Sequence, residues 1–185
     1  MRKLSNNELD RLDISGFKDS EKKPVVVVLD NVRSLNNIGS IFRTCDAFRV
    51  NRLILCGIST PPPHRDIHKT ALGAELSVDW EYFEHTVDAV RICMQQGFKP
   101  IALEQTDSSI PLQQFNPFQS RNTGTIASLQ PLQPIALIFG NEIHGVTQEV
   151  IDLCDLAVEI PQFGTKHSMN VAVSAGIVLW QVLGR

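Results

Sequence analysis

The sequence lacks the long apolar runs that mark membrane proteins. A transmembrane helix needs about 20 consecutive apolar residues, whereas the longest apolar stretches here are Val25–Leu29, Pro134–Phe139 and Val171–Trp180. No apolar segment follows the basic residues Arg2 and Lys3, so we expect no secretory signal. We therefore expect a cytoplasmic protein with no membrane partner.

Cysteines are few and widely spaced, and none forms a CxxC pair. Each lies among apolar residues, which favours buried free thiols over disulfides or zinc ligands. No set of histidines and carboxylates has the spacing of a metal site, so we expect no metal. The four cysteines are Cys45, Cys56, Cys93 and Cys154.

Positive charge is not in excess, because 17 basic residues face 20 acidic ones and the net charge is -3. This balance argues weakly against a protein that coats nucleic acid without specificity. Basic residues nevertheless concentrate between residues 33 and 69. They form either one face that meets phosphate or scattered solvated charges. They are Arg33, Arg43, Arg49, Arg52, Arg65 and Lys69.

The remaining pattern alternates strands and helices, which is typical of an open, mostly parallel α/β sheet flanked by helices. With 185 residues, we expect one globular domain over 25–185, preceded by an N-terminal helix (4–13) and connector within 1–24. The segment 105–134 breaks the alternation, and we interpret it as a loop that is either functional or mobile. Strands are expected at Val25–Leu29, Arg52–Gly57, Val78–Phe83, Pro100–Glu104, Ile135–Phe139 and Leu156–Ile160, and helices at 37–48, 70–75, 86–96, 147–154 and 170–183.

Two of these helices carry further information. In the helix at 37–48, Gly39 and Ser40 leave room for a ligand to approach Arg43. The helix at 170–183 is apolar nearly all round, so both of its sides must be covered. The sheet can cover one side, and a second subunit is a plausible cover for the other.

Polar loops follow three expected strands, at 30–43, 139–145 and 160–170. Ligands of open α/β sheets bind at the carboxyl ends of strands, so we expect a site where these loops meet. None of them contains GxGxxG, GxxxxGK[ST], HExxH or GxSxG, which argues against dinucleotide, P-loop, zinc-protease and serine-hydrolase sites.

The three loops together resemble a known set of motifs. The segments Asn37–Arg43, Phe139–Val146 and Ile160–Val171 are similar, in order and spacing, to the motifs of the SpoU (TrmH-like) RNA 2'-O-ribose methyltransferases of the SPOUT superfamily. The resemblance extends from about Val25 to the C-terminus and includes Lys69–Glu75.

This resemblance implies a C-terminal deep trefoil knot, S-adenosyl-L-methionine as methyl donor, an RNA ribose as acceptor and a homodimer. tRNA is the preferred substrate, with the D-loop guanosine 18 as the best single expectation, and ribosomal RNA is the alternative. A SPOUT-like RNA-binding or assembly protein without catalysis is the second class of function.

The resemblance also assigns roles to residues. Glycines at 140, 145 and 164 would let the backbone approach a cofactor. The cofactor-binding residues would be Leu103, Glu104, Gly140, Asn141, Gly145, Ile160 and Met169; the catalytic residues Arg43, Asn37, Glu142, Ser168 and Asn170; and the RNA-binding residues Arg33, Arg43, Arg65 and Lys69.

Arg43 is the central expectation, because a ribose hydroxyl becomes a nucleophile only if its developing negative charge is stabilised. A guanidinium stays protonated in ordinary sites, so we favour electrostatic stabilisation and phosphate binding over a general-base role. Glu142 would anchor neighbouring loops or Arg43, or be a surface acid, and Asn37, Ser168 and Asn170 could instead be helix caps. Ile143 and Met169 depart from the usual motif spellings.

Overall fold

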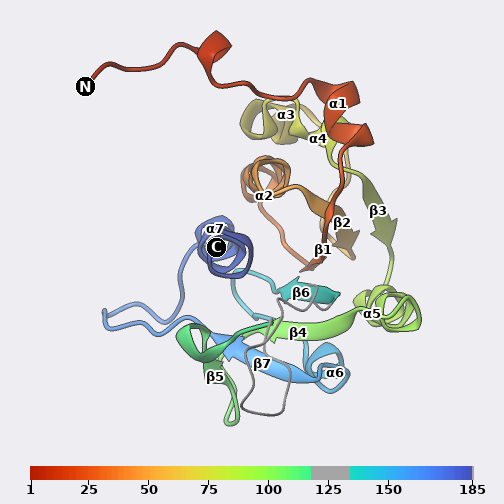
Figure 1. The fold of residues 1–185 in the computed structure, drawn as a ribbon. Helices are drawn as coiled ribbons and strands as arrows, with labels where there is room; N and C mark the ends of the chain where they lie inside the picture. Colours follow the sequence, from red (N-terminus) through yellow and green to blue (C-terminus); the bar gives the residue numbers. More distant parts are fainter. Residues whose placement is uncertain (118–133, 185) are drawn as a thin grey trace, which may run out of the picture.

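Seven parallel strands form one sheet in the computed structural model, which describes residues 1–117 and 134–184. Their order across the sheet is β3-β2-β1-β6-β4-β7-β5 (Figure 1). All the strand pairings of the described ranges are parallel, which confirms the expected class of fold. The strands are β1 (Lys23–Asp30), β2 (Val50–Cys56), β3 (Trp80–Phe83), β4 (Lys99–Leu103), β5 (Ile110–Pro111), β6 (Ile135–Phe139) and β7 (Leu156–Glu159).

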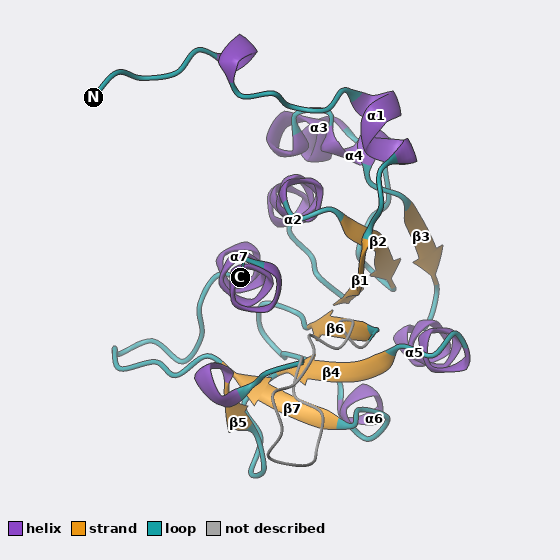
Figure 2. Cartoon of the chain, viewed as in Figure 1, coloured by secondary structure: helices purple, strands orange, loops and turns teal. Residues whose placement is uncertain are grey.

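Helices cover both faces of the sheet (Figure 2). Helices α2 and α7 contact each other over one face, and α5 and α6 contact each other over the opposite face. The helices are η1 (Asn6–Glu8), α1 (Ile14–Asp19), α2 (Leu35–Ala47), α3 (Arg65–Ala71), α4 (Ala74–Ser77), α5 (Thr86–Gln95), η2 (Leu112–Gln114), α6 (Gln148–Ile151) and α7 (Val171–Leu183).

Strand β1 lies in the middle of the sheet and is buried on both sides. Val25, Val27 and Leu29 belong to the apolar core under α2 and α7, whereas Val26 and Val28 belong to the core under α5 and α6. Side chains alternate between the faces of a strand, so a strand covered on both faces needs an unbroken apolar run. This requirement explains why the run of valines predicts the strand.

The sheet grows in both directions from β1. The chain adds β2 and β3 on one side of β1 and then builds β4, β7 and β5 on the other, with β6 inserted between β1 and β4. The register pairs Leu29 with Phe139, Phe139 with Leu103, and Leu103 with Val158. The strands β1, β6, β4 and β7 therefore end at one level, and the loops that follow them meet at this edge.

Close packing of α2 against α3 corrects one interpretation of the sequence. A Cβ atom at Gly39 would lie 2.4 Å from the carbonyl oxygen of Ile67 and 2.1 Å from Oγ1 of Thr70. The Thr70 hydroxyl donates to the carbonyl oxygen of Asn36 at 3.0 Å. The space beside Gly39 is therefore filled by α3 and is not open to a ligand that approaches Arg43.

Two further expectations differ from the structure. The expected N-terminal helix at 4–13 is wrong, because only a short 3-10 turn lies there and the helix α1 begins at Ile14, where Asp13 accepts a hydrogen bond from the Gly16 amide at 2.7 Å. The start of the expected loop at 105–134 contains β5, which pairs with β7, and η2. Residues 118–133 of that expected loop lie outside the described residues.

Within the described ranges, no helix has the length and apolar character needed to cross a membrane. The four cysteines are free, as expected, and Cys45, Cys56 and Cys93 are buried. Burial raises the pKa of the Cys56 and Cys154 thiols to about 12. These thiols stay protonated near neutral pH and are poor nucleophiles.

Candidate functional site

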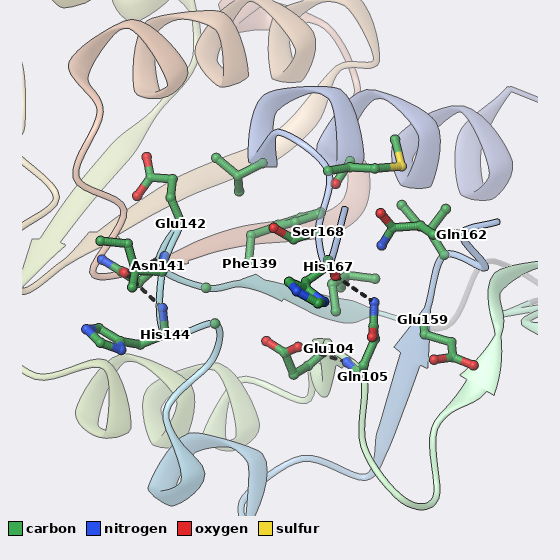
Figure 3. A pocket seen from close by; sticks show the side chains of 18 of the residues that line it. Glu104, Gln105, Phe139, Asn141, Glu142, His144, Glu159, Gln162, His167 and Ser168 are labelled. Carbon is green, nitrogen blue, oxygen red and sulfur yellow. Dashed lines mark hydrogen bonds between the residues drawn. The ribbon is translucent and has the colours of Figure 1, made fainter. Parts of the chain in front are cut away.

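A cavity of about 300 Å³ opens at the carboxyl ends of β4, β6 and β7 (Figure 3). It is bounded by the segments that leave these strands and by the first turn of α7. All seven residues that the sequence predicted to contact a cofactor line it, together with Glu142 and Ser168. The complete lining is Leu103, Glu104, Gln105, Phe139, Gly140, Asn141, Glu142, Ile143, His144, Gly145, Val158, Glu159, Ile160, Gln162, His167, Ser168, Met169, Val171 and Ser174.

The segment 141–145 after β6 forms a tight loop. The Asn141 amide donates to the Gly145 carbonyl at 3.0 Å, and the Gly145 amide donates to the Asn141 carbonyl at 2.9 Å. The side-chain oxygen of Asn141 accepts from the amides of Ile143 and His144, at 2.9 and 3.2 Å (Figure 3). Asn141 therefore fixes the loop from inside, and Ile143, which is 74% exposed, fits without strain on its tip.

Glu104 joins two walls of the cavity. Its carboxylate accepts hydrogen bonds from the backbone amides of Val146 and Gln105, both at 2.9 Å. The Gln105 side chain in turn donates to the carbonyl oxygen of His167 at 3.4 Å. These bonds connect the ends of β4 and β6 with the long loop before α7, so Glu104 has a structural role in addition to any contact with a ligand.

Two glycines of the site also serve contacts between loops. A Cβ atom at Gly140 would lie 2.0 Å from the carbonyl carbon of Gly145, and one at Gly145 would lie 2.1 Å from Oε2 of Glu104. Gly145 also has a φ of +67°, which favours glycine. Of the three glycines expected to approach the cofactor, only Gly164 has open space around its Cβ position. The backbone at 140 and 145 therefore approaches other protein atoms.

Glu142 binds the beginning of α2. Its carboxylate accepts from the backbone amides of Arg33 and Ser34 and from the side-chain amide of Asn37, each at 3.0 Å. Partial burial acts to raise the pKa of Glu142, but the hydrogen bonds outweigh it and the pKa lies below its ordinary value. The expectation that Glu142 anchors a neighbouring loop agrees with these contacts, whereas a contact with Arg43 is absent from its hydrogen bonds and ion pairs.

Asn37 and Asn170 extend this connection to α7. The side-chain amide of Asn170 donates to Oδ1 of Asn37 at 3.1 Å, and Oδ1 of Asn170 accepts from the amides of Ala172 and Val173. Asn170 is therefore the N-cap of α7 and also a partner of Asn37. The cap of α2 is Ser34, so Asn37 is not a cap.

Asp30 and Asn31 were not among the predicted site residues. They bind the segment 141–147 that follows β6. The fully buried Asp30 carboxylate accepts from the Thr147 amide at 2.8 Å and from the Thr86 hydroxyl at 2.5 Å. The Asn31 carbonyl accepts from the Asn141 side chain at 2.7 Å. In the sequence, Asp30 and Asn31 indicated only the end of a strand, because their roles depend on tertiary contacts with Thr86, Asn141 and Thr147.

Arg43 does not line the cavity. It lies six residues beyond Asn37 on α2, which is roughly 9 Å along the helix axis, and its side chain is exposed. It lines a groove of about 850 Å³ between the N-terminal segment, α2 and α4. Arg11 and Arg49 line the same groove. Within a single chain, the structure thus separates the expected catalytic arginine from the expected cofactor residues.

The residues expected to bind RNA lie on different elements of the chain. Arg33 lies beside Asn37 and Glu142 in one pocket, Arg43 lies in the groove described above, and Arg65 lines a separate pocket beside Trp80. Lys69 is exposed on α3. Arg65 and Lys69 are four residues apart on α3 and therefore neighbours on the helix surface, whereas Arg43 lies in a different pocket.

The charge of the cavity lining restricts its ligand. Three carboxylates, those of Glu104, Glu142 and Glu159, line the cavity, and its lining contains no lysine or arginine. Such a cavity favours a ligand with positive charge and disfavours a phosphate group. Among the described residues, no group of three or more His, Cys, Asp or Glu side chains is arranged to hold a metal ion.

Comparison with known proteins gives one family. The sequence model of the SpoU rRNA Methylase family matches residues 24–180. A tRNA (guanosine(18)-2'-O)-methyltransferase of Aquifex aeolicus is 25% identical over 169 residues, which cover 88% of this chain and 70% of the relative. A 23S rRNA (guanosine-2'-O-)-methyltransferase RlmB of Vibrio parahaemolyticus is 27% identical over 178 residues, which cover 95% of this chain and 65% of the relative.

Solved structures show the same fold. A tRNA-modifying enzyme, TrmH/SpoU of A. aeolicus, matches with a TM-score of 0.74 at 24% identity, covering 91% of this chain and 78% of that one. An AdoMet-bound rRNA methyltransferase of Sinorhizobium meliloti matches with a TM-score of 0.74 at 26% identity. The match covers 89% of this chain and 58% of that one, so the chain spans little more than half of the second structure.

Proposed function

The chain belongs to the SpoU rRNA methylase family, and on this premise we propose that it transfers a methyl group from S-adenosylmethionine to the 2'-hydroxyl of a ribose in RNA. The observation that carries the proposal is the cavity at the ends of β4, β6 and β7. Glu104 accepts a hydrogen bond from the Val146 amide, and Glu142 accepts from the Ser34 amide and the Asn37 side chain, so distant segments of the chain are held around the cavity. A site of this kind binds one small ligand in a fixed orientation.

The cavity residues fit S-adenosylmethionine. The ligand carries a sulfonium and an ammonium, and the three cavity carboxylates compensate these charges. Leu103, Ile160 and Met169 provide an apolar wall for the adenine. When bound, the cofactor supplies a methyl group that the positive sulfur already activates. The chain's own task is to orient the ribose hydroxyl and to stabilise the charge that develops on its oxygen.

Arg43 supplies that stabilisation in this proposal, and a second copy of the chain brings it to the cavity. The outer face of α7 carries Val173, Ile177 and Trp180, which are 52%, 38% and 65% exposed. An apolar helix face of this kind requires cover. A homodimer formed through α7 buries this face and places α2 of one copy beside the cavity of the other.

The RNA binds across the groove that contains Arg43. In the described parts of the chain, the guanidinium groups of Arg11, Arg43 and Arg49 make no hydrogen bond or ion pair, so all three are available to phosphates. Ser168 lines the cavity and Asn170 caps α7 beside it, where their polar groups can contact the ribose. Arg33, Arg65 and Lys69 extend the contact with the RNA backbone.

tRNA is the preferred substrate, with guanosine 18 as the target, and ribosomal RNA is the alternative. The A. aeolicus relative supports the first substrate by its name, and the V. parahaemolyticus relative supports the second. The proposal also includes the division into residues 1–24 and a single domain at 25–185, the C-terminal trefoil knot and a cytoplasmic location.

Methylation of purified tRNA and 23S rRNA with radiolabelled S-adenosylmethionine tests the proposal. We expect incorporation into one RNA class, resistance of the modified position to alkaline hydrolysis, and a single modified nucleotide after mapping. Calorimetry with S-adenosylmethionine separates the second candidate, a non-catalytic RNA-binding protein. Absence of cofactor binding together with retained RNA binding would favour that candidate and contradict the enzyme.

A further inference from the structure

A second pocket, of about 600 Å³, lies away from the cavity and has a distinct chemistry. Helices α3 and α4 form part of its wall, and residues 71–74, where α3 ends and α4 begins, line the Arg43 groove. Trp80, at the start of the edge strand β3, is 36% exposed in this pocket, and Leu76 is 56% exposed. The pocket is lined by Pro62, Pro63, His64, Arg65, His68, Glu75, Leu76 and Trp80.

The apolar part of this lining suits a flat ring. The indole ring, a leucine and two prolines offer stacking and van der Waals surface. Unstacked bases of RNA bind to such aromatic side chains. A planar, heteroaromatic ligand is therefore favoured.

Positive groups lie at the rim. Arg65 is exposed and has no ion pair in the described segments. His64 accepts a hydrogen bond from the Asp66 amide through Nδ1 at 3.1 Å, so its other ring nitrogen carries the proton and can donate. A phosphate that is attached to the flat ligand finds donors here, which indicates a nucleotide.

Glu75 determines which base fits. Its side chain is only 8% exposed, one carboxylate oxygen bonds His68, and the other, Oε2, is buried without a hydrogen-bond donor among the described residues. A buried carboxylate oxygen without a donor is unfavourable, so a ligand with N–H groups gains affinity by supplying one. The His68 side chain is 68% exposed, so a ligand that replaces it as the partner of Glu75 would gain both carboxylate oxygens.

We propose that this pocket binds a guanine base of the RNA substrate, an inference that rests on the proposed function. Guanine presents adjacent N1–H and N2–H donors that match the two oxygens of a carboxylate. Adenine and cytosine place an acceptor at this edge, and uracil flanks its single N3–H with two carbonyl oxygens, so Glu75 repels all three. The protein thus reads the identity of one base apart from the nucleotide that it methylates.

Titration with guanosine and adenosine monophosphates, followed by NMR, tests this site in the full chain. The chain has two tryptophans, so two indole N–H signals are expected, and Trp80→Phe assigns them. We expect guanosine monophosphate to shift the Trp80 signal with a dissociation constant about tenfold or more below that of adenosine monophosphate. Glu75→Gln abolishes the preference, whereas Glu84→Gln, at an exposed acid after β3, leaves it unchanged.

The possible outcomes distinguish a failure of the guanine site from a failure of the proposed methyltransferase function. An equal response to both nucleotides, or a preference that survives Glu75→Gln, overturns the guanine site even if the protein methylates RNA. A selective response of Trp80 in a protein that fails to methylate RNA supports the site and contradicts the methyltransferase. A Trp80 signal that depends on protein concentration and ignores both nucleotides shows that a second chain fills the pocket, which also overturns the site.

Discussion

The side-chain oxygen of Asn37 accepts a hydrogen bond of 3.1 Å from Asn170, although 133 residues separate them. The amide of the same side chain donates to Glu142 at 3.0 Å. One asparagine thus uses both its acceptor and its donor to connect two other polar side chains. Asn37, Glu142 and Asn170 each come from a different one of the three loop motifs. Their mutual hydrogen bonds explain why the three motifs occur together.

Asn37→Asp should disrupt this connection, because it places a second carboxylate against Glu142. We expect a lower unfolding temperature and a loss of methyl transfer larger than the loss of cofactor affinity. Adding Glu142→Gln to this variant supplies a donor to Asp at 37 and should restore part of the stability. A double-mutant cycle from thermal unfolding measures the coupling. Additive effects of the two substitutions would contradict a direct contact.

The lowered pKa of Glu142 predicts a pH dependence of stability. A carboxyl whose pKa is lower in the folded state stabilises the protein fully above its ordinary pKa, and this contribution is lost as the pH falls through the folded value. Wild-type protein should therefore exceed Glu142→Gln in free energy of unfolding near neutral pH, and the difference should shrink in acid below the ordinary carboxyl pKa. Urea unfolding at a series of pH values measures it. A difference that is constant with pH would argue against these hydrogen bonds.

Gly140→Ala should destabilise the loop after β6, because the new methyl group meets the backbone of Gly145 at 2.0 Å. Overpacking against backbone costs about 1–3 kcal/mol. Denaturant unfolding measures this loss, and calorimetry should show weaker binding of S-adenosylmethionine. Gly164→Ala is the matched control, since a Cβ atom there has nothing within 4 Å. Equal losses of stability in the two variants would contradict the claim that the close approach of Gly140 to Gly145 requires glycine.

The sequence predicts the central strands because their chemistry is unambiguous. An unbroken run such as Val25–Leu29 is stable only where both faces are covered. The strand β5 is different, since Ile110 and Pro111 are too few to form a pattern and pair only because β7 offers an edge. The helix α1 was missed because its stability depends on the cap at Asp13 and on burial of Phe17, not on a long apolar face.

The candidate site, like the fold, could be predicted only in part. Glu104 and Asn141 were expected from the resemblance to the SpoU motifs, and the position of polar loops after parallel strands predicted only that the loop containing Asn141 lies at this edge. At the glycines 140 and 145, the sequence indicates a close approach of the backbone, but only the structure shows that another loop makes one. The place of Arg43 could not be predicted, because its distance from the cavity depends on the packing of α2.

Arg11→Gln and Arg49→Gln should weaken RNA binding if the RNA crosses their groove. Each substitution removes one phosphate contact, so the slope of log affinity against log salt concentration should fall by about one. Fluorescence anisotropy with labelled tRNA at several salt concentrations measures the slope. Arg91→Gln is the control, because this arginine lies on α5 at the opposite face of the sheet. An unchanged slope in both groove variants would place the RNA elsewhere.

Arg43→Ala should abolish methyl transfer while leaving the affinity for S-adenosylmethionine nearly unchanged, because Arg43 does not line the cavity. If a second copy supplies Arg43, mixed dimers of Arg43→Ala with a cavity-defective variant such as Gly140→Val regain activity. In such a dimer, the intact cavity of the first chain faces the intact Arg43 of the second. Co-expression with two affinity tags isolates the mixed dimer, and each homodimer serves as an inactive control. Inactive mixed dimers would require Arg43 to reach the cavity of its own chain, which needs a movement of α2.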